Sequence, residues 1–392
     1  MTDPELMTTR AKQIFADVET DNPDTGYPTG LVLAKPGIKK IKPHMVGMEG
    51  QSAPPATLLL NSNESAYGPS HHAVAAARAA SSTLERYVEN VDLTLVPAIA
   101  ARFALPGDRI TTGQGSDDLL ARLARGYIGP GDELIRSANG YLKVPNYVYA
   151  NDGFVVNVAD DNFVPSVNRI IAAITERTKI VYLANPENPA GTYLSGSEVR
   201  RLHAAMPRTA LLVLDAAYEE YVDAPDYEPA QVLTLEADNV VMCRTFSKIY
   251  GLAGARVGWL LGPNYVVDTV KRLALTFPIA NPSVAAALAA LEDQAHTKFV
   301  FAQNLASRNW LSDELACLGL NVIPSQTNFV LVELPDADRS AEKLDHALRQ
   351  QGIALRQMAS PAYKKYIRIT LGFQQDLERL LGQIERFLKG EI

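Results

Sequence analysis

The feature that most constrains the fold is a pair of apolar runs without alternation. Residues 180–183 read Ile-Val-Tyr-Leu and residues 211–214 read Leu-Leu-Val-Leu, so both faces of each predicted strand are apolar. Such strands must be covered on both faces, as in a parallel sheet between two helical layers. Further β-branched runs alternate with helical patterns from about residue 73, at residues 110–112, 133–136, 154–158, 179–184, 210–214 and 240–244. This alternation predicts an α/β domain with a largely parallel sheet.

A different pattern begins near Asn281-Pro282. An alanine-rich helical stretch is expected from residue 283 to about 318, and two predicted strands, at 328–334 and 366–371, alternate with two further helices. Few strands with helices on one side indicate a smaller α+β domain. We therefore predict an N-terminal arm (1–66), a large α/β domain (67–282) and a small C-terminal domain (283–392).

Composition narrows the class of protein. The 392 residues include 37 basic and 44 acidic side chains, a net charge of −7, which argues against a nucleic-acid-binding protein. The longest apolar stretches are well short of the roughly 20 residues that cross a membrane, and the opening residues lack the apolar core of a signal peptide. The two cysteines, Cys243 and Cys317, form no CxxC pattern. We expect a cytoplasmic protein without disulfides or membrane association.

Unusual polar motifs follow four of the predicted strands. Ligands bind beyond the carboxyl ends of parallel strands in open α/β sheets, so functional groups are expected at these positions. The motifs are Gly113-Gln-Gly115-Ser116-Asp117, Asn185-Pro-Glu-Asn188-Pro-Ala-Gly191, Asp215 with Tyr218, and Thr245-Phe-Ser247-Lys248. Each has an ordinary structural explanation when taken singly: a glycine turn, a rigid turn, a strand end and a surface loop. Asp215 is the exception, because a carboxylate at the end of an apolar strand is costly unless a cation pairs with it.

Together the four motifs supply complementary groups. The glycine loop opens a helix whose free N–H groups can hold a phosphate. The other three motifs supply a carboxylate, amide and phenol groups, and one lysine. These groups match the needs of pyridoxal 5′-phosphate (PLP): a lysine that forms a Schiff base, a carboxylate that pairs with the pyridinium nitrogen, and donors to the ring oxygen.

The chain resembles the fold-type I aminotransferases, and within them the histidinol-phosphate aminotransferase family. The resemblance runs from about residue 37 to the end. Its most specific segments are Ser247-Lys248-x-x-Gly251-x-x-Gly254-x-Arg256-x-Gly258, Asn185-Pro-x-Asn188-Pro-x-Gly191 and Leu60-Asn-x-Asn63-Glu64-x-x-Tyr67-Gly68-Pro69-Ser70.

The resemblance implies a role for each matching residue. Lys248 would form the Schiff base, Asp215 would pair with the pyridine nitrogen, and Asn188 and Tyr218 would contact the ring 3′-oxygen. Tyr141 falls near the position of the residue that stacks on the ring. The phosphate would be held by Gly115, Ser116, Asp117, Thr245, Ser247 and Arg256.

The resemblance also implies a homodimer with shared sites. Tyr87 matches a tyrosine that reaches the cofactor phosphate of the neighbouring subunit, and the N-terminal arm would pack on the small domain and on the partner. On the substrate side, Arg368 matches the arginine that binds the α-carboxylate, a task that suits its planar fork. Arg356, Asn63 and Tyr67 would complete the substrate-binding set.

The implied activity is that of a PLP-dependent aminotransferase with a ping-pong mechanism. L-histidinol phosphate is the leading amino donor and 2-oxoglutarate the acceptor, which would place the enzyme in histidine biosynthesis. Two departures lie on the substrate side: Glu333 stands where many members carry an arginine, and residues 274–278 differ from the usual Arg-x-Pro-Phe-Asn. A phosphate could instead be met by Arg356, with Tyr27, Lys39 or Lys40 as helpers.

Three alternatives remain open from the sequence. The donor could be an unphosphorylated aromatic or imidazole amino acid, or the enzyme could be a related decarboxylase of phosphorylated amino acids. A non-catalytic PLP-binding regulator is disfavoured, because no DNA-binding segment accompanies the α/β body. We expect no metal site: His71 and His72 are adjacent on a predicted helix and should point apart, and the other histidines lack ligand spacing.

Overall fold

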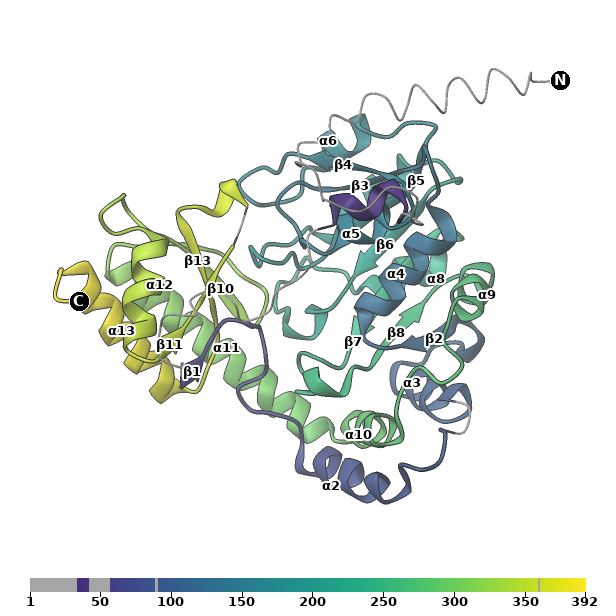
Figure 1. The fold of residues 1–392 in the computed structure, drawn as a ribbon, viewed down its shortest axis with the longest axis horizontal. Helices are drawn as coiled ribbons and strands as arrows, with labels where there is room; N and C mark the ends of the chain where they lie inside the picture. The colour runs from purple at the N-terminus through teal and green to yellow at the C-terminus, as the bar shows by residue number, and fades with distance from the viewer. Residues whose placement is uncertain (1–33, 42–56, 89–90, 359) are drawn as a thin grey trace, which may run out of the picture. The chain divides into compact units, whose positions relative to one another are not determined.

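The computed structural model describes residues 34–41, 57–88, 91–358 and 360–392 (Figure 1). Most of the predicted N-terminal arm, including Tyr27, lies outside these ranges. The described residues from Gly37 onward belong to one compact unit.

The larger part is built on a seven-stranded sheet in the order β2-β8-β7-β6-β5-β3-β4. The strands are β2 (Ile110–Gly113), β3 (Glu133–Ser137), β4 (Phe154–Val158), β5 (Thr178–Ala184), β6 (Leu211–Asp215), β7 (Val240–Thr245) and β8 (Gly258–Leu261). All neighbouring strands from β4 to β7 pair in parallel. Strand β8 runs antiparallel to both β2 and β7, so β2 points the same way as the parallel strands. The predicted α/β class is confirmed.

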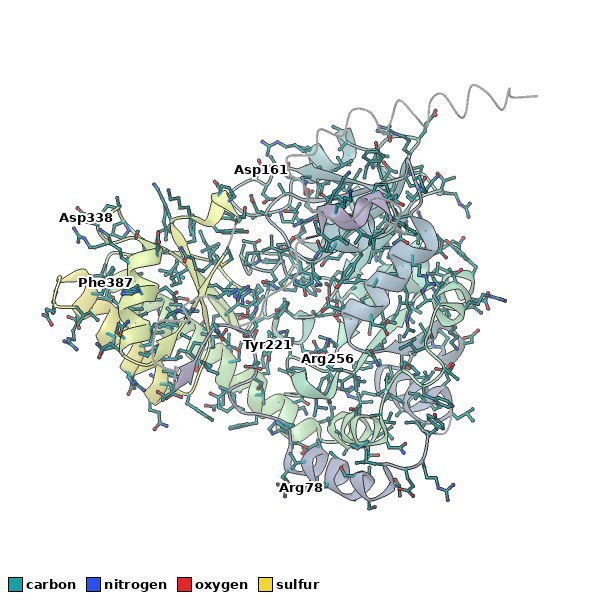
Figure 2. The ribbon with its side chains drawn as sticks, viewed as in Figure 1. Arg78, Asp161, Tyr221, Arg256, Asp338 and Phe387 are labelled. Atoms are coloured by element: carbon teal, nitrogen blue, oxygen red, sulfur yellow. The ribbon has the colours of Figure 1, made fainter. Side chains whose placement is uncertain are left out.

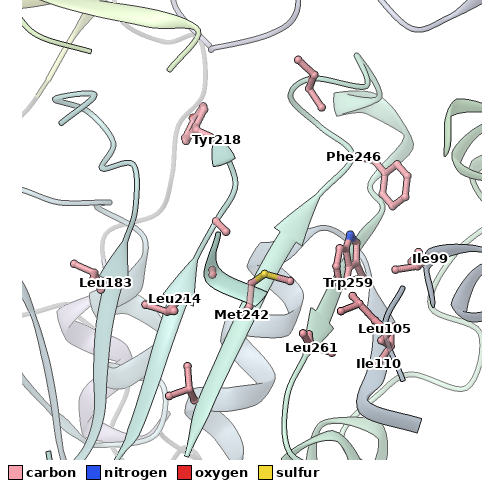
Figure 3. Packing of buried hydrophobic residues seen from close by; sticks show 14 of the residues in the cluster. Ile99, Leu105, Ile110, Leu183, Leu214, Tyr218, Met242, Phe246, Trp259 and Leu261 are labelled. Carbon is pink, nitrogen blue, oxygen red and sulfur yellow. The ribbon is translucent and has the colours of Figure 1, made fainter. Parts of the chain in front are cut away.

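Two apolar clusters cover the two faces of this sheet. On β6, Leu212 and Leu214 belong to one cluster, whereas Leu211 and Val213 belong to the other. Figure 3 shows part of the first cluster, with Leu214 on the central strand. Successive strand residues point to opposite faces, so the continuous apolar run is what double coverage requires.

Helices form both covering layers. The first cluster draws residues from α2 (His71–Ala80), α3 (Leu95–Phe103), α6 (Val167–Ala172), α7 (Gly196–Ala204), α8 (Ala230–Glu236) and α10 (Asn281–Glu292). The second draws them from α4 (Ser116–Tyr127), α5 (Val144–Tyr149) and α9 (Asn264–Arg272).

The smaller part has its own antiparallel sheet, in the order β12-β13-β10-β9, and its own apolar cluster. Its elements are β9 (Asn321–Ile323), β10 (Phe329–Glu333), β12 (Arg356–Gln357), β13 (Tyr366–Thr370), α11 (Gln294–Cys317), α12 (Ala341–Gln350) and α13 (Gln374–Leu388). Strand β1 (Leu58–Leu59) pairs in parallel with β11 (Ile353–Ala354), and Leu60 joins the cluster. The predicted domain boundaries remain a proposal.

The alanine-rich stretch after residue 283 differs from the single helix that we predicted. It divides at Asp293, which leaves α-helical geometry with φ −81° and ψ 71°. The Asp293 carboxylate accepts a hydrogen bond from the backbone N–H of His296 and so caps α11. An aspartate is a common first residue of a helix, so Asp293 could have indicated the break. The sequence analysis instead treated the helical pattern on both sides of it as one helix.

The expectation that His71 and His72 point apart is wrong. Their ring centroids lie 3.9 Å from each other. Both residues lie in the first turn of α2, where each side chain is exposed and free to turn toward its neighbour. The Cβ atoms of consecutive helical residues point in different directions, but the side-chain torsions bring these two rings together.

Both cysteines are free thiols, with Cys243 buried and Cys317 exposed. In the described part of the chain, no helix has the length and apolar character needed to span a membrane.

Candidate active site

The carboxyl ends of β2, β5, β6 and β7 meet at one edge of the large sheet, and a cavity of about 260 Å³ lies there. Each of the four predicted motifs contributes to its wall. Ten of the predicted cofactor residues line it: Ser116, Asp117, Tyr141, Asn188, Asp215, Tyr218, Thr245, Ser247, Lys248 and Arg256. The cavity thus lies where the sequence analysis expected a ligand, beyond the carboxyl ends of the parallel strands.

Asp215 is the most informative residue of the site. It ends β6, is 6% exposed, and its Oδ2 accepts a 2.7 Å hydrogen bond from the Tyr182 hydroxyl. Its Oδ1 is buried and has no hydrogen-bond partner among the described residues. Burial raises the pKa of Asp215 to about 6, and the Tyr182 hydrogen bond opposes that rise. A buried carboxylate oxygen without a donor is costly, so the site is suited to a ligand that brings an N–H group.

Lys248 lies on the loop that follows β7. Its Nζ donates to the backbone carbonyl of Asn63 at 3.2 Å and lies 5.5 Å from the centroid of the Tyr218 ring. The same Asn63 donates through Nδ2 to the Tyr218 hydroxyl at 2.9 Å. Asn63, predicted for the substrate side, thus joins the lysine and the phenol at the cavity wall.

An anion cradle faces these groups. Ser116 begins α4 directly after Gly115, which has φ +81°. Arg256 Nη1 donates to Ser247 Oγ at 3.2 Å, and Thr245 Oγ1 donates to the same oxygen at 2.9 Å. Figure 2 labels the Arg256 side chain. A Cβ at position 115 would collide with the Arg256 guanidinium. Hydroxyls, a guanidinium and a helix N-terminus are the groups that hold a phosphate.

Asp117 departs from the phosphate-contact role in one respect. Its carboxylate accepts hydrogen bonds from Tyr147 at 2.8 Å and from Tyr141 at 3.2 Å. These bonds direct the carboxylate to the tyrosines, so a contact from Asp117 to a phosphate would come from the helix backbone.

Arg368, predicted to bind the substrate carboxylate, lies on β13 and, like Arg356, is not among the residues that line the cavity. Its Nη1 donates to Asn188 Oδ1 at 2.7 Å and its Nη2 to the Asn61 carbonyl at 2.9 Å. Its Nε is buried without a hydrogen-bond partner among the described residues, and burial lowers the pKa of Arg368 to about 10. Arg356 stands directly opposite Arg368 in the register of β12 and β13. A pair of adjacent arginines is suited to a doubly charged phosphate or to the two carboxylates of a dicarboxylic acid.

Other predicted residues lie outside the cavity wall. Tyr87 is 77% exposed and stacks on Phe277 at 4.1 Å. Tyr67 makes edge contacts with Phe299 and Phe373, at 5.4 and 5.1 Å between ring centroids.

Lys40, one of the three proposed helpers, and Glu333 contact other residues. Lys40 lies over the Tyr149 and Phe154 rings, beside β4. The Glu333 carboxylate accepts a hydrogen bond from Asn321 at 3.0 Å.

The sequence analysis missed Tyr182, which lines the cavity, and Glu187, which lies next to the lining residue Asn188. Tyr182 was treated only as an apolar strand residue, although it lies on β5 within reach of Asp215. Glu187 is buried, and its Oε1 accepts a hydrogen bond from the Asn188 backbone N–H at 3.0 Å. Burial raises the pKa of Glu187 to about 8, whereas nearby Arg136 lowers it. The sequence did mark Glu187 as unusual, because it is a charged residue between two Asn-Pro steps. It did not indicate which residue Glu187 would contact.

Comparison with known proteins decides the family. The model of the aminotransferase class I and II family matches residues 55–384. The chain belongs to this family. A histidinol-phosphate aminotransferase of Paramagnetospirillum magneticum is 41% identical over 355 residues, covering 90% of this chain and 98% of the relative. One from Rhodopseudomonas palustris is 41% identical over 358 residues, covering 91% and 98%.

Solved structures agree. The histidinol-phosphate aminotransferase of Sinorhizobium meliloti, in complex with PLP, is 28% identical with a TM-score of 0.86, covering 94% of this chain and all of that one (100%). A histidinol-phosphate aminotransferase, described as putative, from Erwinia carotovora is 27% identical with a TM-score of 0.81, covering 87% and 99%. The predicted resemblance is confirmed, and the enzyme is a PLP-dependent aminotransferase.

Proposed function

We propose that this aminotransferase takes its amino group from L-histidinol phosphate and passes it to 2-oxoglutarate, and that it does so with the residues assigned above. The observation that carries the substrate proposal is the Arg356–Arg368 pair, in register across β12 and β13 beside Asn188. The names of relatives at 41% identity support it.

The cofactor fits the cavity on chemical grounds. PLP supplies the carbonyl carbon that takes up the amino group and a protonated ring that withdraws electron density from the substrate Cα. Asp215 Oδ1 would accept the ring N–H, which gives this buried oxygen its missing partner. Ser247, Thr245, Arg256 and the start of α4 would hold the phosphate.

Proton movement falls to Lys248. Its Nζ would remove the proton from the substrate Cα as general base and later return a proton to the carbon of the cofactor. The Asn63 carbonyl, 3.2 Å away, orients this amine within the cavity. Asp215 would balance the positive charge of the protonated ring nitrogen, and the Tyr182 hydroxyl donates a hydrogen bond to Asp215.

Arg368 and Arg356 would bind different anionic groups of the two substrates. Arg368, fixed by Asn188 and the Asn61 carbonyl, would bind the α-carboxylate of glutamate, and Arg356 would bind the phosphate of the amino donor. The objection from Glu333 is weaker than the sequence suggested. Its carboxylate lies at the far end of β10, where Asn321 and Tyr366 donate hydrogen bonds to it.

We further propose a homodimer. Tyr87 is outside the cavity wall of its own chain and stacks on the exposed Phe277 ring. Leu84, Leu93 and Leu275, close to Tyr87 or Phe277 in the sequence, are exposed apolar side chains as well. An exposed apolar surface of this kind is typical of a subunit interface. Asn281 Nδ2 donates to the Arg86 carbonyl at 3.2 Å, which fixes the Tyr87 segment to the first residue of α10. Tyr87 is thereby presented to a partner. The cytoplasmic location stays a prediction.

A comparison of donors tests the substrate proposal. We expect kcat/KM with 2-oxoglutarate to be at least tenfold higher for histidinol phosphate than for phenylalanine, tyrosine or histidine, about 1.4 kcal/mol in transition-state binding. Arg356→Gln should erase that preference and leave the phenylalanine rate within about twofold, because only the phosphorylated donor would use this side chain. A preference for phenylalanine would contradict the proposal and favour the unphosphorylated alternative. Release of carbon dioxide without consumption of 2-oxoglutarate would instead indicate the decarboxylase.

A further inference from the structure

Three potential metal ligands converge outside the active site. His71 and His72 open α2, and Asp293 lies at the junction between α10 and α11. One ligand atom from each residue lies within 4.8 Å of the other two. The sequence separates Asp293 from the histidines by more than two hundred residues, so the fold alone brings the three together.

The carboxylate of this cluster is held in place. Asp293 Oδ1 accepts the backbone N–H of His296 at 3.0 Å, and the Ser70 hydroxyl also donates to the carboxylate. Hydrogen bonds of this kind orient a ligating carboxylate.

We propose that His71, His72 and Asp293 bind one divalent transition-metal ion, with zinc as the best match. Two imidazoles and a carboxylate form a ligand set used for zinc, and water would fill the remaining position. Bonds of roughly 2.0–2.2 Å in tetrahedral geometry place the ligand atoms about 3.4 Å from one another, so separations within 4.8 Å must shorten by at most about 1.4 Å. Both histidine side chains are exposed and free to make that adjustment.

The site has a structural consequence. The ion would tie the first turn of α2 to the start of α11, which carries Leu311 and Leu315 into the apolar cluster of the smaller part. His296 Nε2 donates to the Gly68 carbonyl at 3.1 Å. A Cβ at Gly251 would overlap that same carbonyl. Gly251 follows Lys248 by three residues, so the bound ion would stabilise the chain segment against which the lysine loop packs.

Cobalt and zinc titrations of untagged, PLP-loaded enzyme, freed of metals with a chelator, test the proposal. We expect one Co²⁺ per chain, with the visible bands of a tetrahedral ion at longer wavelength than the cofactor band. Zn²⁺ should displace it and raise the thermal midpoint. His72→Gln and Asp293→Asn should each weaken Co²⁺ binding at least tenfold and remove the Zn²⁺ effect on melting. Asparagine still caps a helix, so the second variant should fold.

Two matched variants control for other sites. His346→Gln removes an exposed histidine on α12, and Cys317→Ser removes the exposed thiol. Both should bind Co²⁺ as the parent does. The transaminase rate of the metal-free enzyme should be the same in all four variants, since none of these residues lines the cavity. The proposal is overturned if no Co²⁺ binds, if binding survives His72→Gln and Asp293→Asn unchanged, or if Cys317→Ser abolishes it.

Discussion

Replacing Asp215 by asparagine should have opposite effects on the stability of the cofactor-free protein and on cofactor binding. Asparagine has the same shape and its carbonyl can still accept the Tyr182 hydrogen bond. Burial raises the pKa of Asp215 from 3.8 to about 6, so the ionised carboxylate lowers the stability of the folded chain. A difference of this size corresponds to about 3 kcal/mol.

The sign of the pH dependence follows from that shift. The folded chain holds the proton of Asp215 more tightly than the unfolded chain does. The penalty is therefore absent below pH 3.8, grows as the pH rises toward about 6, and is complete above that value. At pH 8 the apoenzyme of Asp215→Asn should melt several degrees above the parent apoenzyme, and at pH 5 the gain should be smaller by about 1 kcal/mol.

Cofactor binding should change in the other direction. A neutral amide cannot balance the charge of the protonated ring, so PLP should bind more weakly and the first half-reaction should slow by at least ~10²-fold. Calorimetric melting of the two apoenzymes and single-turnover kinetics measure the two effects.

The Tyr193–Asp226 pair provides the matched control. Tyr193 donates to Asp226 at 2.7 Å in an exposed position, so Asp226→Asn should give no comparable stabilisation. The reasoning would be refuted if the Asp215→Asn apoenzyme melted at or below the parent at pH 8.

Three further predictions follow from the site. Tyr182→Phe should weaken PLP binding to the apoenzyme about tenfold, the effect of removing one hydrogen bond to a charged group; unchanged affinity would show that Asp215 does not depend on it. Arg368→Lys should raise KM for 2-oxoglutarate roughly tenfold or more, because lysine lacks the planar fork, and an unchanged KM would place the carboxylate elsewhere. Mixed dimers of Lys248→Ala and Tyr87→Phe chains should recover up to roughly a quarter of the parent activity, since one site per hybrid is intact. No recovery with proven subunit exchange would mean that each site lies within one chain.

The sequence predicted the site best where position along a strand determined the answer. Asp215 and Lys248 follow apolar runs, and parallel strands bring their carboxyl ends to one edge whatever the details of packing. The role of Tyr182 was not predicted, because it depends on how β5 is aligned with β6 in the sheet. The sequence of one strand does not determine that alignment. The Tyr182 hydroxyl meets Asp215 only after the two strands pair.

Contacts between distant segments were beyond prediction for the same reason. Asp293 and His72 meet because α10 packs against α2, and neither helix carries a pattern that specifies its partner. The position of β8, antiparallel beside β2, was also not predicted. Residues 258–261 are buried, as those of any central strand would be, so their sequence does not indicate the direction of the strand. The class of fold was predictable from the apolar runs, whereas strand order and helix pairing were not.

The central claim is that Lys248, on the loop that follows β7, is the residue to which the cofactor attaches. Borohydride reduction of the PLP-loaded enzyme, followed by proteolysis and peptide mass mapping, tests it most directly. The account predicts a visible band that disappears on reduction and one phosphopyridoxyl group per chain, on the peptide that contains Lys248. A modification on another lysine, or none on a preparation shown to hold the cofactor, would contradict it.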